Sequence, residues 1–256
     1  MKKLILNFLQ KRGYELIKKN QFIGQTRFEI DSNFYDLNIP NATYSPWKGD
    51  RDFLDIYEKI KDNTLVDIYR CYELWQLIEQ AQKINSGANV IEIGAWRGGT
   101  AAVMARKLSN LKSDSIIYIA DTFEGVVKTS DKDNFYIGGE HSDTSEQIVE
   151  NLLAKEARYK NYKILKGMFP EDTSHLIPEN TMFGLCHIDV DVYQSAKDII
   201  SWVWDKLILG GVIVFDDYGF PGCVGITKLV NEQRNLKDRV IIHNLNGHAI
   251  MVKIGQ

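Results

Sequence analysis

The sequence has few cysteines, and their positions give no sign of disulfide pairing. Three cysteines occur among the 256 residues, and no two of them form a C-x-x-C pair. An odd number of widely separated cysteines argues against a disulfide scaffold and is typical of buried, reduced thiols in a cytosolic protein. These residues are Cys71, Cys186 and Cys223.

The chain also lacks an excess of charge of one sign. Its 31 Lys and Arg residues nearly balance 34 Asp and Glu residues, which leaves a formal net charge of -3 at pH 7. This balance provides no overall attraction to nucleic acid or to an anionic membrane surface. Since no Lys/Arg run supplies a basic groove either, we expect neither partner.

Long apolar runs are absent as well. No stretch approaches the roughly 20 apolar residues of a transmembrane helix. The N-terminus begins like a signal peptide, with Lys2 and Lys3 before the apolar Leu4–Leu9, but the run ends at Gln10 without a small-residue cleavage site. The apolar spacing instead predicts an amphipathic helix. We therefore expect a soluble, cytoplasmic protein.

What is present is an ordinary globular composition, with 44% hydrophobic and 25% charged residues. The length accommodates one large α/β domain with an appended segment. Helical periodicity, interrupted by a polar, aromatic-rich stretch, gives way after Gly87 to short apolar runs that alternate with amphipathic segments. We assign residues 1–60 to a helical segment that forms a lid and subunit contacts, and residues 61–256 to the α/β domain.

The alternation predicts a mainly parallel, seven-stranded sheet covered by helices on both faces, with the last strand antiparallel. Strands are expected at residues 90–93, 116–120, 163–165, 183–188, 211–215, 240–243 and 249–254. Helices are expected at residues 67–83, 100–108, 145–159, 193–207 and 226–235.

A glycine-rich turn follows the first expected strand, Val90–Ile93. Gly94 suits a tight turn, and Gly98 and Gly99 let the backbone approach a ligand closely before the helix begins. The spacing is not that of the dinucleotide motif G-x-G-x-x-G, and no Lys-Ser/Thr pair follows to bind phosphate. In a doubly wound sheet, ligands bind at this carboxyl edge.

Two acidic residues indicate which ligand this edge binds. Glu92 is unsuited to a pyrophosphate but suits a cationic, phosphate-free cofactor such as S-adenosylmethionine. Asp121, at the end of the next strand, can accept hydrogen bonds from both hydroxyls of a ribose. The alternative is a glycine-rich turn and a helix-capping Asp that bind no ligand.

Two later strands also end in carboxylates, and we expect Asp189, Asp216 and Asp217 to converge. Three carboxylates that close together repel one another unless a cation lies between them, and oxygen ligands favour Mg²⁺, Mn²⁺ or Ca²⁺. Such an ion can bind two substrate hydroxyls and align one with the cofactor methyl group. Asp191 is the candidate general base, and His187 competes for that role. The alternative treats Asp191 and Asp217 as helix or turn caps.

These residues lie in motifs that together resemble the macrocin O-methyltransferase family. The matching segments occur in the family's order. They are Glu92–Thr100, Asp121–Gly125, Lys166–Pro170, Ile188–Tyr193 and Gly210–Tyr218.

The resemblance implies a Rossmann-like class I methyltransferase that uses S-adenosylmethionine and a divalent metal, Mg²⁺ or Mn²⁺. It implies that Asp189, Asp216 and Asp217 bind the metal and that Asp191 is the base. Asp121 would hold the ribose, Gly167 and Met168 would lie near the adenine, and Thr64 would lie near the methionyl end. The cofactor residues expected from the resemblance are Thr64, Glu92, Gly94, Asp121, Thr122, Gly167, Met168 and Asp189.

The family's activity leads us to expect methylation of a sugar hydroxyl on a nucleotide-sugar, a capsule or polysaccharide precursor, or a glycosylated metabolite. Methylation of a catechol or phenol, and a non-catalytic cofactor-binding protein, are the alternatives. Residues 128–143 match no motif and form either a mobile flap or an ordinary surface loop. The apolar helix faces of the N-terminal segment predict a homo-oligomer.

Overall fold

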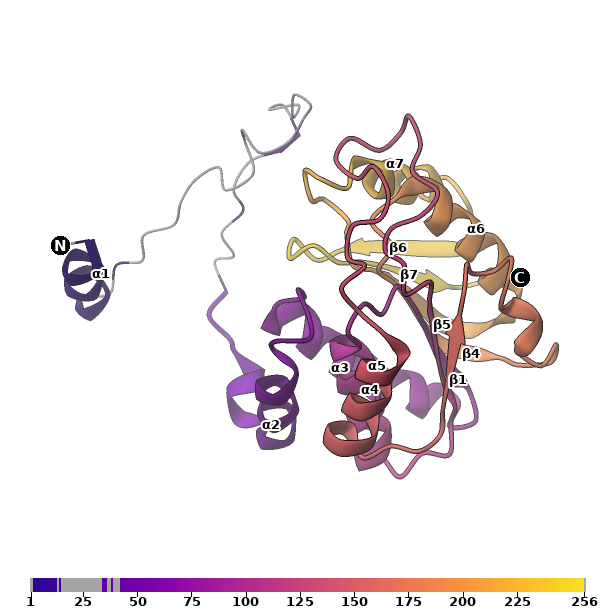
Figure 1. Ribbon diagram of the computed structural model, residues 1–256, viewed down its shortest axis with the longest axis horizontal. Helices are drawn as coiled ribbons and strands as arrows, with labels where there is room; N and C mark the ends of the chain where they lie inside the picture. Colours follow the sequence, from indigo (N-terminus) through magenta and orange to yellow (C-terminus); the bar gives the residue numbers. More distant parts are fainter. Residues whose placement is uncertain (1, 13, 15–33, 36–37, 39–41, 256) are drawn as a thin grey trace.

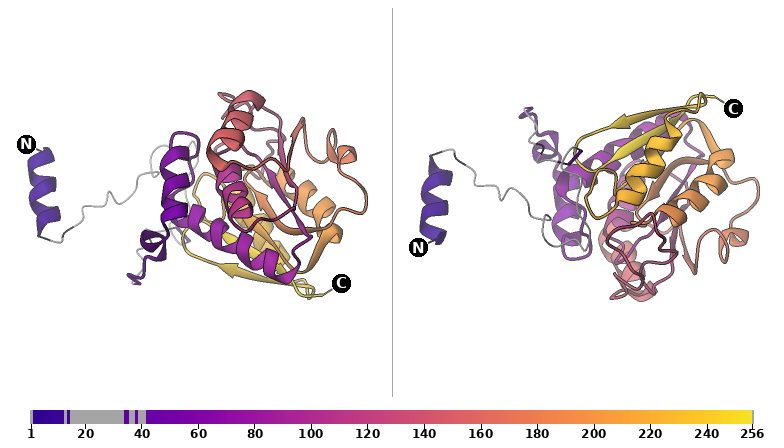
Figure 2. Two further views of the ribbon diagram at one scale, coloured as in Figure 1. Left: turned by 90° about the horizontal axis from the view of Figure 1, so that it is seen from below. Right: turned by 90° about the horizontal axis from the view of Figure 1, so that it is seen from above.

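The computed structural model describes residues 2–12, 14, 34–35, 38 and 42–255. Within these ranges the fold is a seven-stranded sheet between two layers of helices (Figures 1 and 2). Much of the predicted 1–60 segment lies outside the described residues.

The strand order is β3-β2-β1-β4-β5-β7-β6. Strands β1 to β5 run parallel to one another, whereas β7 pairs antiparallel with both β5 and β6. The predicted fold class is therefore confirmed, including the reversed last strand. The strands are β1 (Asn89–Ile93), β2 (Ile117–Asp121), β3 (Tyr162–Lys166), β4 (Phe183–Ile188), β5 (Leu207–Phe215), β6 (Arg239–His243) and β7 (Ala249–Lys253).

Alternate residues of each central strand belong to different apolar clusters, because successive side chains point to opposite faces of a sheet. Val90 packs in one cluster with helices α2, α3, α4 and α5, whereas Ile91 packs in the other with α6 and α7. The first layer comprises α2 (Arg51–Ile60), α3 (Ile68–Ile84), α4 (Gly99–Asn110) and α5 (Glu146–Leu152), and the second α6 (Tyr193–Val203) and α7 (Val224–Gln233).

Helix α3 begins where the sequence predicts. The carboxylate of Asp67 accepts hydrogen bonds from the backbone N–H groups of Tyr69 and Arg70, which otherwise have no partner in the first turn. Seven residues of α3 are buried, so one side of the helix covers the sheet. This fixes the position of Arg70 and Glu73 over the carboxyl edge.

Three elements differ from the prediction by more than two residues. The helix expected at 193–207 ends as α6 at Val203 and is followed by a 3-10 turn, Trp204–Lys206. The helix expected at 145–159 ends as α5 at Leu152 and continues as a π-helical turn, Leu153–Ala157. Strand β5 begins at Leu207, earlier than predicted, because Leu207 pairs with Phe183 before a register shift that accommodates Gly210 and Gly211.

The N-terminal part contains α1 (Lys2–Lys11), a 3-10 turn (Pro46–Gly49) and α2. Helix α2 buries Phe53, Ile56 and Ile60 in the same apolar cluster as α3 and α4. In Figures 1 and 2, α1 lies away from the sheet. Among the described helices, none combines the length and the apolar character that a bilayer crossing requires.

Candidate functional site

A cavity of about 610 Å³ opens at the carboxyl edge of the sheet, where the strand order reverses between β1 and β4. Loops that follow β1, β2, β4 and β5 contribute to its lining. Most of the predicted site residues border it together: Thr64, Gly94, Asp121, Thr122, Gly167, Asp189, Asp191, Asp216 and Asp217. Glu92, Met168 and His187 are not part of the lining.

Glycine is required in the turn after β1 for two different steric reasons. Gly94 has a φ of +86°, and a Cβ at this residue would lie 1.8 Å from the carbonyl oxygen of Asp189. A Cβ at Gly99 would lie 2.6 Å from both the carbonyl oxygen of Asn63 and the Cβ of Thr64. The turn therefore packs tightly against Asp189 on one side and Thr64 on the other.

Asp121 braces this turn. One carboxylate oxygen accepts hydrogen bonds from the N–H groups of Ala95 and Trp96, both at 2.8 Å, and the other from Phe123 at 2.7 Å. Burial raises the pKa of Asp121, and these three backbone donors partly offset that effect. The residue borders the cavity while it holds the two loops together, so a structural role accompanies any contact with a ligand.

Glu92 lies outside the cavity lining, on the sheet face that packs against α3. Its side chain is fully buried, and one carboxylate oxygen lies 2.8 Å from His187 Nδ1. Burial lowers the pKa of His187, but the neighbouring carboxylates of Asp216 and Glu92 outweigh burial and raise it to about 9. His187 is itself inaccessible, which favours Asp191 over His187 as the group that meets a substrate.

The three predicted metal ligands converge. Carboxylate oxygens of Asp189, Asp216 and Asp217 lie within 4.8 Å of one another. Burial raises the pKa of Asp189 and Asp217, and the neighbouring carboxylates raise it further. Oxygen donors whose charge is uncompensated in this way fit a hard divalent cation, so the residues present suit Mg²⁺ or Mn²⁺.

Asp216 is the exception among the three carboxylates. Burial acts to raise its pKa, but Arg70, His187 and His248 outweigh burial and hold the pKa well below the usual range. Arg70 Nη1 contacts one carboxylate oxygen, and His248 Nε2 lies 2.9 Å from the other. The charge of Asp216 is thus compensated by groups within the protein.

Asp191 has a backbone conformation that few residues other than glycine adopt, with a φ of +66°. Its N–H donates to Asp217 at 3.0 Å, which ties the candidate base to the carboxylate cluster. Burial raises the pKa of Asp191, while hydrogen bonding from the Tyr136 hydroxyl lowers it. The thiol of Cys223 also donates to this carboxylate, at 3.7 Å.

The loop at residues 128–143 forms part of the cavity wall, since Phe135, Tyr136 and His141 border the cavity. Several contacts hold it in place, including one between Lys128 and Asp198 at 2.9 Å. At its end, Asp143 accepts a hydrogen bond from Trp96 Nε1 at 2.8 Å and pairs with Arg97 at 2.6 Å. The loop and the glycine-rich turn are therefore connected.

Sequence reasoning missed several residues of the site. Arg70 and His248 contact Asp216, and Glu73 contacts His248. Arg70 and Glu73 lie in helix α3 and His248 lies directly before β7, and no recognised motif surrounds them. Strand alternation does predict that His187 is a neighbour of Asp216. Asp216 lies on the same sheet face as Val214, and Val214 pairs with His187 of β4. For Tyr136 the only indication in the sequence was its position in the 128–143 loop, to which no motif gave a role.

Comparisons with known proteins show what the chain is similar to. A family described as macrocin-O-methyltransferase (TylF) matches residues 58–250. The chain is 24% identical over 191 residues to mycinamicin III 3''-O-methyltransferase of Micromonospora griseorubida, covering 70% of this chain and 74% of that protein. It is 24% identical over 197 residues to demethyldecarbamoylnovobiocin O-methyltransferase of Streptomyces niveus, covering 72% and 74%.

Solved structures share the fold. The O-methyltransferase NovP superposes with a TM-score of 0.63 at 23% identity, covering 75% of this chain and 82% of that one. The calicheamicin methyltransferase CalS11 superposes with a TM-score of 0.60 at 14% identity, covering 87% and 100%.

Proposed function

The chain belongs to the macrocin O-methyltransferase family of S-adenosylmethionine-dependent O-methyltransferases, and we propose that its acceptor is a sugar hydroxyl of a small glycosylated molecule. The names of its relatives support this class of acceptor. They include, besides the two above, a methyltransferase acting on the rhamnosyl group of a tetracenomycin in Streptomyces olivaceus, 26% identical over 172 residues. The observation that carries the proposal is that Asp121 and the carboxylate cluster open into one cavity.

We assign the β1 and β2 side of the cavity to the cofactor. In this arrangement Asp121 accepts hydrogen bonds from the ribose, Gly94 and Thr122 border the nucleoside, and Gly167 lies near the adenine. Thr64 and Asp189 border the methionyl part. Neither Glu92 nor Met168 borders the cavity, so the lining does not support a direct contact of either side chain with the cofactor.

We assign Asp189, Asp216 and Asp217 to a divalent cation, Mg²⁺ or Mn²⁺. When bound, such an ion lowers the pKa of an acceptor hydroxyl that it contacts and helps to orient it. The protein contributes three oxygen donors at one end of the cavity, and the backbone of Asp191 is tied to this cluster through Asp217.

In the proposed reaction the acceptor oxygen attacks the cofactor methyl carbon, and the bond between that carbon and the sulfonium sulfur breaks. The electron pair of this bond stays on sulfur, which yields S-adenosylhomocysteine. The hydroxyl proton passes to the Asp191 carboxylate. The Tyr136 hydroxyl, which donates to Asp191, holds this carboxylate at the cavity. Burial of the surrounding side chains keeps bulk water from competing with the acceptor.

For residues 1–60 we propose roles in covering the acceptor and in contacts between copies of the chain. Exposed apolar side chains of α1 support this proposal, since Ile5 is 54% and Phe8 is 57% exposed. Sedimentation of the full chain and of a chain lacking residues 2–12 tests the oligomer directly, because loss of assembly in the shorter chain is the expected result.

Turnover after metal removal tests the proposed function. EDTA-treated protein is titrated calorimetrically with S-adenosylmethionine, with NAD as the control ligand. Formation of S-adenosylhomocysteine is then measured with Mg²⁺ and separate panels of glycosides, nucleotide-sugars and catechols. We expect Mg²⁺-dependent turnover on sugar-bearing acceptors, and we expect the substitution Asp216→Asn to abolish this turnover. Turnover on catechols alone would contradict the acceptor class, and cofactor binding without any turnover would support a non-catalytic protein.

A further inference from the structure

On the sheet face that packs against α3, polar side chains replace apolar ones at the carboxyl edge. Strand alternation places Glu92 on the same face as Val90, and Asp216 on the same face as Val214. The polar residues that continue these apolar rows are Glu92, His187 and Asp216, and all three are buried. Glu92 Oε1 and His187 Nδ1 lie 2.8 Å apart, whereas Glu92 Oε2 and His187 Nε2 have no hydrogen-bond partner among the described residues.

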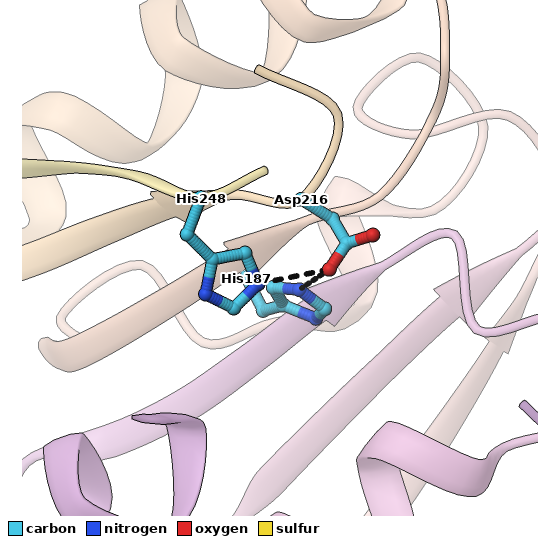
Figure 3. A group of neighbouring side chains, drawn as sticks. All are labelled: His187, Asp216 and His248. Carbon is cyan, nitrogen blue, oxygen red and sulfur yellow. Dashed lines mark hydrogen bonds and ion pairs between the residues drawn. The ribbon is translucent and has the colours of Figure 1, made fainter. Parts of the chain in front are cut away.

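His248 joins the cluster through the antiparallel pairing of β5 and β7. Phe215 pairs with Ala249, which places Asp216 opposite His248. Figure 3 shows the rings of His187 and His248 directed at the Asp216 carboxylate, with His248 Nε2 2.9 Å and His187 Nε2 3.6 Å from the same oxygen. His248 is fully buried, so this contact is shielded from water.

The other nitrogen of His248 is held by helix α3. His248 Nδ1 lies 2.6 Å from Glu73 Oε2, and the second oxygen of Glu73 accepts a hydrogen bond from Asn244 in the turn before β7. Arg70, three residues before Glu73 on the same helix, pairs with the oxygen of Asp216 that His248 leaves free. Neighbouring positions of one helix thus hold both oxygens of a single carboxylate, one directly and one through an imidazole.

The atoms of His187, Asp216 and His248 also lie close enough to bind a metal ion of their own. Two observations favour hydrogen bonding instead. Neither histidine borders the cavity, and both nitrogens of His248 already lie within hydrogen-bond distance of carboxylate oxygens, Nδ1 near Glu73 and Nε2 near Asp216.

We propose that Glu73, acting through His248, is a positioning residue that fixes the Asp216 carboxylate in the orientation needed to bind the divalent cation with Asp189 and Asp217. The inference rests on the proposed function, since it takes Asp216 as a metal ligand. The physical reason is repulsion within the cluster. Asp216 has two free torsions, and two neighbouring carboxylates push it away unless donors at its own oxygens hold it.

The test measures Mn²⁺ affinity by electron paramagnetic resonance, and S-adenosylmethionine affinity by calorimetry, on the full chain. The variants are Glu73→Ala, Glu73→Gln and, as a control on the exposed face of the same helix, Gln80→Ala. We expect Glu73→Ala to weaken Mn²⁺ binding by about 10- to 100-fold, the usual effect of removing a group that orients a ligand. Cofactor affinity should change less than about twofold, and Glu73→Gln, whose amide retains a hydrogen-bond acceptor, should recover part of the loss.

Two results would overturn the inference. If folded Glu73→Ala and Glu73→Gln both bind Mn²⁺ as tightly as the parent chain, Glu73 does not position Asp216. If Mn²⁺ and cofactor affinity fall together with the unfolding temperature in both variants, Glu73 acts only on stability. A third result concerns the parent chain: if it binds cofactor but no Mn²⁺, the metal assignment fails, and the inference fails with it. This result is distinguishable from failure of the inference alone, in which the parent chain binds Mn²⁺ and the variants bind it equally well.

Discussion

Arg70 and Asp216 are 146 positions apart in the sequence, yet they form an ion pair in which both side chains are almost fully buried, at 8% and 4% exposure. Arg70 Nη1 also donates to the backbone carbonyl of Asp216 at 3.2 Å. The pair joins helix α3 to the end of β5, at the place where the carboxylate cluster borders the cavity. It links the stability of the domain to the geometry of the site.

Removal of Arg70 should therefore destabilise the protein strongly. We expect Arg70→Ala to lower the free energy of unfolding by about 3–5 kcal/mol, because a buried carboxylate loses its partner. Urea denaturation measures this change, with Arg51→Ala on the exposed surface of α2 as the control. A loss as small as that of the control would mean that the histidines alone compensate Asp216.

The glycine turn should not tolerate a side chain at Gly94. Its φ of +86° and the 1.8 Å approach of a built Cβ to the Asp189 carbonyl mean that Gly94→Ala must shift the backbone of both loops. A strained conformation of this kind costs about 1–3 kcal/mol. We expect a lower unfolding temperature and at least tenfold weaker binding of S-adenosylmethionine. Gly49→Ala is the control, because no atom lies within 4 Å of a Cβ placed there. Its unfolding temperature and its affinity for S-adenosylmethionine should equal those of the parent chain.

Asp191→Asn tests the assignment of the base. An amide cannot accept the hydroxyl proton, so we expect kcat to fall by about 10²–10⁴-fold, the range usual for a general base. Affinity for S-adenosylmethionine should stay within about twofold. Asp131→Asn in the neighbouring exposed loop provides the control. Unchanged kcat in Asp191→Asn would show that another group takes the proton.

Glu79 should make stability depend on pH in the acid range. Hydrogen bonds from Lys107 and Lys83 lower its pKa from 4.5 to about 2 in the folded protein. Its contribution is therefore fully present above pH 4.5 and is lost as the pH falls towards 2. The side chain is 37% exposed, so solvent screening limits the effect to below about 1 kcal/mol. Denaturation of the parent chain and Glu79→Gln at pH 7, 4 and 2.5 should show a difference that shrinks with acidity. A difference that grows on acidification would reverse the assigned sign.

Most of the architecture could be predicted from local patterns. Apolar runs that alternate with amphipathic segments predicted every strand of the sheet, because burial on both faces demands continuous apolar strands. Three boundaries were wrong by more than two residues. The helix expected to end at Leu207 ends at Val203, and Leu207 itself begins β5. Gly210 and Gly211 resemble a break before β5, yet pairing with β4 extends the strand back to Leu207. The helix expected to end at Tyr159 loses its regular hydrogen bonding after Leu152. The residue at which a helix or strand ends depends on the elements packed against it, and a local sequence pattern carries no information about those elements.

The sequence by itself determined which residues meet where neighbouring parallel strands end, at the carboxyl edge of the sheet. Asp189 and Asp216 each follow directly on adjacent strands, and parallel strands end at the same edge, so their convergence follows from the order of elements. The glycines after β1 likewise predict a close approach of the backbone, because only a residue without a Cβ leaves room for it.

Only the tertiary structure decided how those residues are held and which of them are accessible. Glu92, next to the glycine turn in sequence, pairs with His187 beneath the sheet edge, because strand alternation turns its side chain towards α3. Arg70 and Glu73 reach Asp216 and His248 because packing of α3 on the sheet brings them there. Contacts between elements so distant in the chain arise from the packing of whole surfaces, and no short-range periodicity records them.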